Sequence, residues 1–217
     1  MLSEHWPLFD LRIRTPRLEL RYPADDDLAL LVELTREEVH APDFMPFSTP
    51  WTRAKSPDRE RNALRFWWRL RATLGADEWV LPFLVVDDGE PVGVQDLKGV
   101  AFPVTRSVVT GSWLVRRRQG TGIGKEMRAA VLHLAFAGFG AVEAHTAAFV
   151  DNPASLGVTR SLGYAPNGSQ TDDREGQPVE HLRFVLPRNA WETRRRDDVE
   201  IYGLERTVDF LGIDSRT

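Results

Sequence analysis

A glycine-rich turn between a predicted strand and a predicted helix is the segment of this sequence best suited to chemistry. Residues 107–116 form an apolar strand pattern, and Gln119-Gly-Thr-Gly-Ile-Gly124 follows after two further arginines. Helical spacing of apolar residues then continues to about residue 138. Glycine lets the backbone approach a ligand closely, and the first N–H groups of a helix have no partner inside it. This order predicts an anion site suited to a pyrophosphate.

Two common glycine loops match this turn only in part. A P-loop needs Ser or Thr after Gly-Lys, where Glu126 stands here, and a first glycine where Gln119 stands. A dinucleotide-binding loop needs a third glycine where Lys125 stands, although Glu143 lies where an acid that binds ribose would be expected. A long segment also precedes the turn, whereas dinucleotide-binding units normally open with it. Both loops are therefore weaker explanations than a third pattern.

The third pattern is [Gln/Arg]-x-x-Gly-x-[Gly/Ala], which Gln119, Gly122 and Gly124 satisfy. A second segment, Asn152-Pro-Ala-Ser155 followed by Leu162-Gly-Tyr164, lies further along the chain. Together they resemble the pyrophosphate loop and the N-x-x-S…L-G-F segment of the GCN5-related N-acetyltransferases (GNAT), which bind acyl-coenzyme A. The spacing is most similar to the Rim-type branch, which acetylates the N-termini of ribosomal proteins.

The resemblance is specific over residues 107–164 and extends more weakly, through the order of elements, to about 14–187. Residues 111–114, Gly-Ser-Trp-Leu, resemble a strand-four sequence of the family. The resemblance implies that the strands beside the loop splay, so that a backbone N–H can meet the acyl carbonyl. Backbone groups of Leu114 and Val115 would hold the pantetheine arm. The residues expected to bind the coenzyme are Leu114, Val115, Arg117, Gln119, Gly120, Thr121, Gly122, Ile123, Gly124, Lys125, Asn152 and Ser155.

The resemblance also implies catalytic roles for Asn152 and Ser155. Many members carry a tyrosine seven residues after the asparagine as the acid for the leaving thiolate, but Thr159 stands here. The Rim-type branch is similar to this chain in having a serine at the position of Ser155, whose hydroxyl could contact the sulfur or relay a proton through water. Asn-Pro is also a helix-start signal, so Asn152 can cap a helix as well.

The general base is not identified by the sequence. Many relatives carry a glutamate on strand four, where Thr110 stands in this chain. Water could accept the proton, and histidine is suited to the task by its near-neutral pKa. The candidate side chains are Glu38, His40, Asp96, Glu143 and His145.

An apolar, proline-rich segment over residues 41–52 is the expected acceptor wall. Its Phe44, Phe47 and Trp51 are the predicted substrate-binding residues, whereas Trp67 and Trp68 follow helical spacing and serve either the core or the pocket. A cluster of cations over residues 53–65 either forms a charged outer helix face or binds a carboxylated acyl donor. Acceptor specificity is expected in variable loops near 41–55 and 166–180.

Composition limits the class of protein. The 217 residues suit one substantial core, and a formal net charge of −4 argues against a protein that coats nucleic acid. The chain contains no cysteine. Disulfides, thiolate zinc sites and a cysteine nucleophile are thereby excluded, and no metal is expected. Neither a secretory signal nor a run of about 18 apolar residues is found, which predicts a cytoplasmic protein without a membrane partner.

The order of elements predicts a mixed α/β (α+β) fold. Strands are expected over 17–22, 79–86, 91–97, 107–116, 142–149 and 180–186, and helices near 25–34, 56–75, 122–138 and 153–161. This order fits the GNAT fold, a mostly antiparallel sheet of six to seven strands with helices on both faces, better than a doubly wound sheet. One domain is predicted over residues 1–190. Residues 191–217 are predicted to be an extension that forms a helix or contacts a partner.

The sequence therefore predicts an acyl-CoA-dependent N-acyltransferase. The simplest reaction is transfer of acetyl from acetyl-CoA to a primary amine, on a protein N-terminus or a small molecule, by direct attack in a ternary complex. Two alternatives stay open: succinyl-CoA as the donor, and a module that senses acyl-CoA without turnover, since the strand glutamate and helix tyrosine are missing. A nucleotide-dependent oxidoreductase is a distant third. A homodimer is expected from the family alone.

Overall fold

The computed structural model describes residues 2–213 of the 217-residue chain. Residues 214–217 of the predicted C-terminal extension lie outside the described residues, as does residue 1. The strands are β1 (Arg12–Arg14), β2 (Leu18–Arg21), β3 (Glu78–Asp87), β4 (Glu90–Val100), β5 (Ser107–Leu114), β6 (Glu143–Phe149), β7 (Ala165–Arg174), β8 (Gln177–Pro187) and β9 (Glu200–Tyr202).

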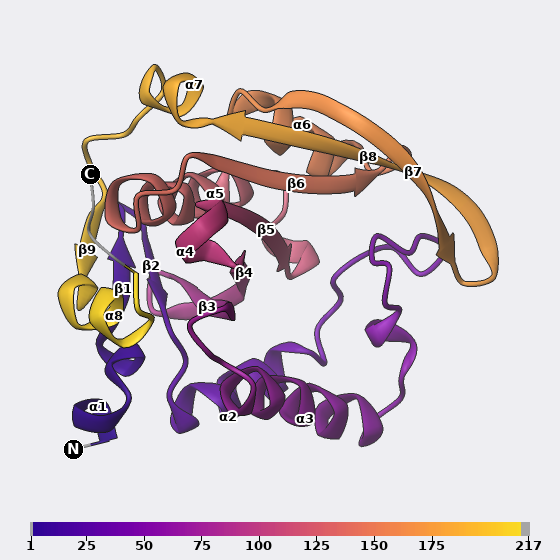
Figure 1. The fold of residues 1–217 in the computed structure, drawn as a ribbon. Coiled ribbons are helices and arrows are strands. Elements are labelled where there is room, and N and C mark those ends of the chain that lie inside the picture. The colour runs from indigo at the N-terminus through magenta and orange to yellow at the C-terminus, as the bar shows by residue number, and fades with distance from the viewer. Residues whose placement is uncertain (1, 214–217) are drawn as a thin grey trace.

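These nine strands form one sheet in the order β7-β8-β6-β5-β4-β3-β2-β1-β9 (Figure 1). Only the pair β5 and β6 is parallel, and every other neighbouring pair is antiparallel. The predicted mixed, mostly antiparallel sheet is confirmed, but the predicted count of six to seven strands is too low. The additional strands carry no alternating hydrophobic pattern, because β1 and β9 are three residues long and β7 is polar.

Helices cover both faces of the sheet, as predicted (Figure 1). No helix within residues 2–213 is long and apolar enough to cross a membrane. The α-helices are α1 (Leu2–His5), α2 (Asp25–Leu34), α3 (Asp58–Ala72), α4 (Phe102–Thr105), α5 (Ile123–His133), α6 (Pro153–Ser161), α7 (Arg188–Glu192) and α8 (Leu204–Phe210). Short 3-10 turns span Pro7–Asp10, Trp51–Arg53 and Arg116–Arg118, and a π-helical turn, Leu134–Gly138, extends α5.

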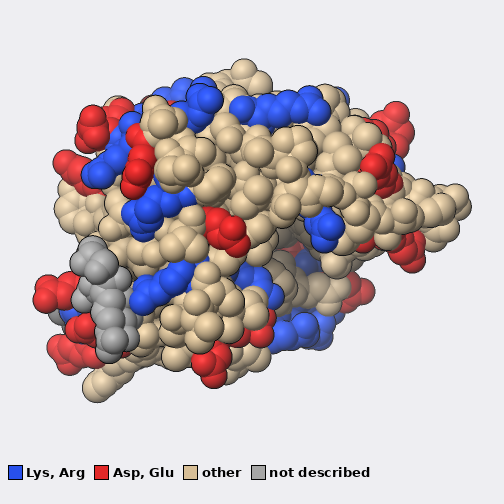
Figure 2. Space-filling model, turned by 45° about the horizontal axis from the view of Figure 1, so that its top comes forward, with Lys and Arg blue, Asp and Glu red and all other residues tan. Residues whose placement is uncertain are grey.

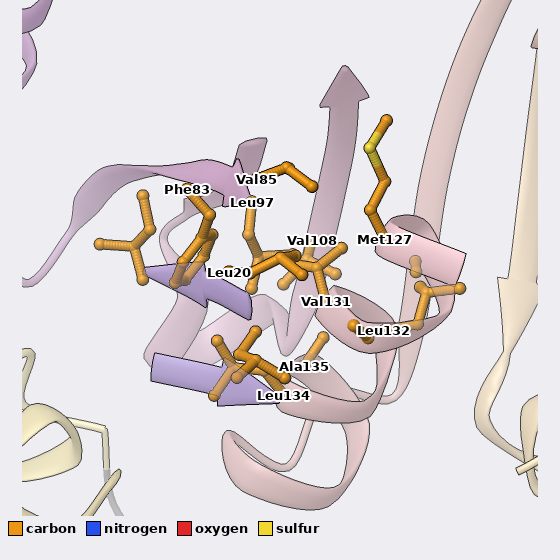
Figure 3. Packing of buried hydrophobic residues seen from close by; sticks show 14 of the residues in the cluster. Leu20, Phe83, Val85, Leu97, Val108, Met127, Val131, Leu132, Leu134 and Ala135 are labelled. Atoms are coloured by element: carbon orange, nitrogen blue, oxygen red, sulfur yellow. The ribbon is translucent and has the colours of Figure 1, made fainter. Parts of the chain in front are cut away.

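The larger core lies between the sheet and α5. Helical spacing puts Met127 and Val131 on the face of α5 that turns toward the strands, where they are buried with Phe83 and Val108 (Figure 3). On the opposite face, α2 and α3 lie side by side and pack on a smaller cluster with β3 and β4 (Figure 1). Trp67 belongs to this cluster, whereas Trp68 is 53% exposed. Of the two helical tryptophans, Trp67 therefore serves the core.

The segment expected as a variable loop over 166–180 is instead a hairpin. Strands β7 and β8 pair antiparallel around a turn at Glu175-Gly176, both of which have positive φ. Almost every residue of β7 is exposed. Because neither face of β7 is covered, no hydrophobic alternation marks it in the sequence. The hairpin extends from the body of the molecule toward the segment that joins α2 to α3 (Figure 1).

The C-terminal segment adds a strand and a helix beside the start of the chain. Strand β9 pairs antiparallel with β1 at the edge of the sheet. After α8, Leu211 and Ile213 are 0% and 3% exposed, and Phe210 packs edge-on against Trp6 at 5.0 Å between ring centroids. The two ends of the described chain thus pack together on one side of the molecule (Figure 1).

Candidate active site

The glycine turn after β5 presents a row of free backbone donors. Gly120 and Gly122 have φ values of +74° and +88°, a conformation that favours glycine and turns the chain into α5. Within residues 2–213, none of the backbone N–H groups of residues 120–124 donates to a protein acceptor. The same N–H groups stand at the positive end of the α5 dipole. The turn therefore presents free N–H groups at a helix N-terminus, the arrangement from which the sequence predicts a phosphate site.

Side chains around the turn brace it from within. Gln119 donates its amide to the carbonyls of Val39 (2.7 Å) and Leu114 (3.0 Å). Thr121 donates its hydroxyl to the Arg118 carbonyl at 2.7 Å. Ile123 is 1% exposed and faces the core. At these three positions the side chains hold the loop, so the loop can offer a ligand mainly its backbone.

The predicted cations differ in what they already contact. Arg117 contacts Glu37 (Nε–Oε2 2.8 Å) and Glu90 (Nη1–Oε2 3.2 Å). Its neighbours Arg116 and Arg118 are also paired with carboxylates. Lys125 is exposed and has no ion pair within the described part of the chain. Figure 2 shows basic and acidic groups interspersed over the face in view, without a large surface of one sign.

The sequence reasoning missed one cation at the turn. Arg17, just before β2, donates through Nη1 to the Thr121 carbonyl at 3.3 Å and pairs with Glu126 of α5 at 3.3 Å. A Cβ added to Gly122 would lie 3.9 Å from the Arg17 guanidinium. Only the position of Arg17 beside the boundary dipeptide Thr15-Pro16 could have drawn attention to it.

Strands β5 and β6 diverge beside the turn. They pair in parallel only over Ser107–Val109 and Glu143–His145, although β5 continues to Leu114 and β6 to Phe149. Each remains paired on its outer side, β5 with β4 and β6 with β8. Successive backbone groups of a strand point to alternate sides, so part of the 110–114 backbone faces this gap. The structure thus contains the predicted splay.

Leu114 and Val115 end β5 at the mouth of this gap. Leu114 is 7% exposed and its carbonyl accepts from Gln119, as noted above. The N–H of Val115 donates to the Val92 carbonyl at 3.0 Å, and its carbonyl accepts from Arg118 N–H at 3.0 Å. Both backbone groups of Val115 are therefore engaged within the protein.

Asn152 and Ser155 begin helix α6. The Asn152 side-chain oxygen accepts from the Ser155 backbone N–H at 3.1 Å, which is an N-cap. The Ser155 side chain is half-buried, and its hydroxyl has no hydrogen-bond partner among the residues described. Asn152 therefore has the capping role that the sequence allowed, while the Ser155 hydroxyl is free to contact a ligand.

Aromatic side chains line the sheet face that carries α2 and α3. Phe47 lies 5.4 Å from Trp51, which lies 5.3 Å from Trp113 of β5, between ring centroids. His40 extends this row, 5.9 Å from Phe47. Phe44 lies apart from it, 5.8 Å from the Arg174 guanidinium of β7. Two of the three predicted acceptor residues therefore meet the splayed strand through Trp113, which the sequence reasoning did not assign to the acceptor.

Asp96 has the most unusual environment of the candidate bases. It pairs with Gly111 across β4 and β5, and its Oδ1 is buried without a hydrogen-bond partner in the part of the chain that the structure describes. Val94 and Trp113 share its face of the sheet, because side chains alternate along a strand. Gly111 leaves space beside the carboxylate, since an added Cβ would lie 3.8 Å from Oδ2. Burial alone raises the pKa of Asp96 to about 7.

The other candidate bases already have partners. The His40 ring contacts the Ala41 carbonyl through Nδ1 (2.8 Å) and the Thr52 hydroxyl through Nε2 (2.7 Å). His145 and Glu143 contact each other at 2.9 Å. Glu38 pairs with Arg116 at 3.2 Å. Asp96 is thus the candidate with an oxygen left without a partner.

The arginine cluster over residues 53–65 is directed to groups of the protein itself. Arg53 binds Glu175 of the hairpin turn, with Nε–Oε1 at 2.7 Å. Arg59 donates to the carbonyls of Ala54 and Thr35. Arg61 lies on the outer surface beside Asp58, with 62% of its side chain exposed. Over residues 2–213, no three His, Asp or Glu side chains stand close enough together to hold a metal ion.

Comparison with known proteins places this geometry in a family. A family model described as "Acetyltransferase (GNAT) domain" matches residues 17–165. Mycobacterium smegmatis RimJ in complex with a coenzyme A disulfide has the same fold, with a TM-score of 0.67 and 20% identity, over 94% of this chain and 95% of that chain. RimL, a ribosomal L7/L12 α-N-protein acetyltransferase in complex with coenzyme A, shares the fold with a TM-score of 0.65 and 19% identity, over 81% of this chain and 97% of that chain.

A spermidine N-acetyltransferase SpeG chimera, built from the Vibrio cholerae and hSSAT proteins, also shares the fold. Its TM-score is 0.63 at 16% identity, over 82% of this chain and 99% of that chain. The presence of RimJ and RimL among these structures agrees with the resemblance to the Rim-type branch. The match over residues 17–165 shows that this chain belongs to the GNAT family of N-acetyltransferases.

Proposed function

We propose that this protein transfers acetyl from acetyl-CoA to a primary amine, by direct attack of the amine within a ternary complex. The observation that carries the proposal is the continuity between two features. The gap between β5 and β6 lies directly beside a turn whose five N–H groups, residues 120–124, are free. A coenzyme with a pyrophosphate at the turn can extend its acyl end into the gap. The absence of cysteine from the chain favours direct attack over an acyl-cysteine route.

The coenzyme site in this proposal comprises the turn and the start of α6. The backbone of Gly120, Thr121, Gly122, Ile123 and Gly124 binds the pyrophosphate, while Gln119 braces the loop. Lys125 and Arg17 supply positive charge. Arg117 supplies charge to the extent that the coenzyme competes with Glu37 and Glu90. Leu114, Val115, Asn152 and Ser155 flank the pantetheine arm.

The chemistry requires a polarised carbonyl and a neutral amine. The backbone of β5 that faces the gap polarises the thioester carbonyl. The attacking nitrogen forms the new C–N bond, the C–S bond breaks, and the electron pair goes to sulfur. Asp96 accepts the proton that the amine loses, because its carboxylate lies beside Gly111 on the aromatic face of the sheet. The Ser155 hydroxyl contacts the sulfur or relays a proton to it through water.

The acceptor enters from the aromatic face in this proposal, between Phe47, Trp51 and Phe44. Two acceptor classes follow from the neighbours, since RimL is an α-N-protein acetyltransferase and SpeG a spermidine acetyltransferase. A donor with a carboxylate is not favoured, because Arg53 and Arg59 already bind groups of the protein. Acetyl-CoA is therefore the preferred donor over succinyl-CoA.

Calorimetric titration with acetyl-CoA, succinyl-CoA, free coenzyme A and NADH tests the proposal. Micromolar binding of acetyl-CoA, followed by acetylation of an N-terminal peptide or a polyamine, supports it. Tighter binding of succinyl-CoA would favour the alternative donor, and binding without transfer to any amine would favour a sensor. Silence toward every coenzyme A species would refute the proposal. Light scattering and cell fractionation test the expected homodimer and cytoplasmic location.

A further inference from the structure

Arg128 of α5 is a buried cation that has no carboxylate partner within residues 2–213. Its side chain is 4% exposed, and its Nε makes no hydrogen bond. Nη1 donates to the Thr159 hydroxyl and Nη2 to the Ser112 hydroxyl, each at 3.1 Å. A buried charge is normally paired, because transfer of each ion from water into the protein costs roughly several kcal/mol. Two neutral hydroxyls compensate only part of this cost.

The groups that surround Arg128 confirm that its charge is not balanced. Burial lowers the pKa of Arg128, and among the described residues the titratable group that interacts with its charge is the Tyr164 phenol. Tyr164 itself is 5% exposed and has a raised pKa because of burial, so it stays neutral. Glu126, two residues earlier on α5, turns away to Thr15 and Arg17. Guanidinium groups are not deprotonated in proteins, so Arg128 keeps its positive charge.

The position of Arg128 connects the turn with the gap. It lies one helical turn beyond Gly124, and its two hydroxyl partners come from β5 and from α6. Ser112 belongs to the part of β5 that has separated from β6. Thr110 and Tyr164 contact each other at 3.3 Å at the narrow end of the same gap. A chain that runs from the turn into the gap would therefore pass Ser112, one of the two residues that hold the guanidinium.

We propose that Arg128 is the positive charge that stabilises the coenzyme A thiolate as it leaves the acyl group. The proposal rests on the acyl transfer proposed above. When the C–S bond breaks, the electron pair goes to sulfur, and the guanidinium offsets this new negative charge without losing a proton. The amine proton goes separately to Asp96 on the other face of the sheet. An unpaired cation that is held rigidly before the reaction needs no reorganisation when the charge develops.

Ultraviolet titration of the thiolate of free coenzyme A bound to the protein tests this role without knowledge of the acceptor. Desulfo-coenzyme A supplies the blank. In the wild type the bound thiol should titrate at least about one pH unit below the free thiol. This shift corresponds to a ratio of thiolate to thiol that is about tenfold higher at a given pH. Arg128→Met should return the bound thiol to the free value. Arg160→Met, an exposed cation on α6, is the matched control and should leave the bound thiol at the wild-type value.

Affinities and turnover provide the second measurement. Arg128→Met should lower kcat by roughly 10²-fold, in the range of a lost oxyanion donor, with little change in the Kd of desulfo-coenzyme A. Equal losses of affinity for coenzyme A and desulfo-coenzyme A, with an unchanged thiol pKa, would overturn the proposal and make Arg128 an anchor for the arm. Failure of the wild type to bind coenzyme A would instead refute the proposed function.

Folding of the variant is controlled by a thermal melt. If Arg128→Met does not fold, Arg128→Lys retains a charge but not the two-hydroxyl contact. Its bound thiol should titrate between the wild-type and free values. A bound thiol in folded Arg128→Lys that titrates at the free value would contradict the proposal, since a cation would then be present without effect on the sulfur. A thiol that titrates at the free value in the wild type itself would end the proposal.

Discussion

Asp96 and Arg128 lie beside adjacent residues of β5 on opposite faces of the sheet, Arg128 buried and Asp96 half-buried. Asp96 stands beside Gly111 on the face lined by aromatic side chains. Arg128 binds Ser112 on the face covered by α5 and α6. They do not compensate each other, because the backbone of the sheet lies between them and neither is coupled to the other. Amide formation needs a proton acceptor on the amine side and positive charge on the thiolate side, and this arrangement supplies both.

Asp96→Asn tests the first of these charges through the pH profile. In the wild type, kcat/KM should rise with pH through about 7, because the carboxylate must be deprotonated to act as a base. The asparagine variant should lose this rise and fall by roughly 10²-fold or more in kcat/KM. Glu143→Gln is the control and should keep the rise. Persistence of the rise in Asp96→Asn, or its loss in Glu143→Gln, would move the base elsewhere.

Asp96→Asn should lower activity but raise the stability of the fold above pH 7. Folded Asp96 holds its proton up to a pKa of about 7, whereas the unfolded carboxyl loses it near 3.8. Between these two pH values the folded state binds more protons than the unfolded state. The stability that Asp96 contributes is therefore fully present below pH 3.8 and is lost as the pH rises through about 7. Above pH 7, Asp96→Asn should therefore melt at a higher temperature than the wild type. A lower melting temperature at pH 8 would show that the carboxylate has a stabilising partner.

At the scale of the elements, the turn before α5 depends on its backbone conformation. Gly122 has a φ of +88°, whereas Gly124 has no such constraint, and a Cβ there would be 3.6 Å from Val158. Gly122→Ala should destabilise the fold by about 1–2 kcal/mol. It should also weaken acetyl-CoA binding by at least about tenfold, since the N–H groups would be displaced. Gly124→Ala is the matched control, with ordinary contacts and near wild-type affinity. Calorimetry distinguishes the two variants, and equal affinities would contradict a backbone phosphate site.

The β7–β8 hairpin is fastened to the end of β6 mainly by Arg174. Its guanidinium makes two 2.7 Å contacts with Asp151 and lies 4.8 Å from the Phe149 ring centroid. The more exposed pair of Arg53 with Glu175 should contribute little, because solvent screens it. Arg174→Ala should therefore speed proteolytic cleavage in the hairpin several-fold, and Arg53→Ala much less. Equal rates in the two variants would show that the hairpin is held in another way.

Particular elements show what the sequence could and could not predict. The strand, turn and helix around residues 107–138 carry clear apolar periodicity, and their order is confirmed. Strand β7 was not predictable by pattern, because it is exposed along most of its length. The isolation of Asp96 depends on the register that sets it opposite Gly111, and register between strands is not visible in a single sequence. The burial of Arg128 was also not predictable, because an arginine that follows the apolar Met127 in a helix is usually expected to be exposed to solvent.

At the scale of the whole molecule, the two ends of the chain complete one sheet edge and one core. Strand β9 pairs with β1, and Gly203, at the start of α8, could not carry a side chain, since an added Cβ would lie 2.5 Å from the Asp10 carbonyl oxygen. Leu211 and Ile213 are buried in the larger core together with Leu8 and Leu11. The C-terminal segment is therefore packed as part of the same core that holds α5. Damage to this segment should lower the stability of the entire fold.

Leu211→Ala tests this coupling. Leu211 is fully buried, so its truncation should cost about 2–5 kcal/mol in the free energy of unfolding. Val104→Ala removes methyl groups from a side chain that is 86% exposed and should change the free energy by less than about 0.5 kcal/mol. Urea unfolding followed by tryptophan fluorescence and by circular dichroism should give one transition in both variants, with the wild-type slope. An early separate transition in Leu211→Ala, with acetyl-CoA binding retained beyond it, would instead mean that the C-terminal segment unfolds independently of the catalytic sheet.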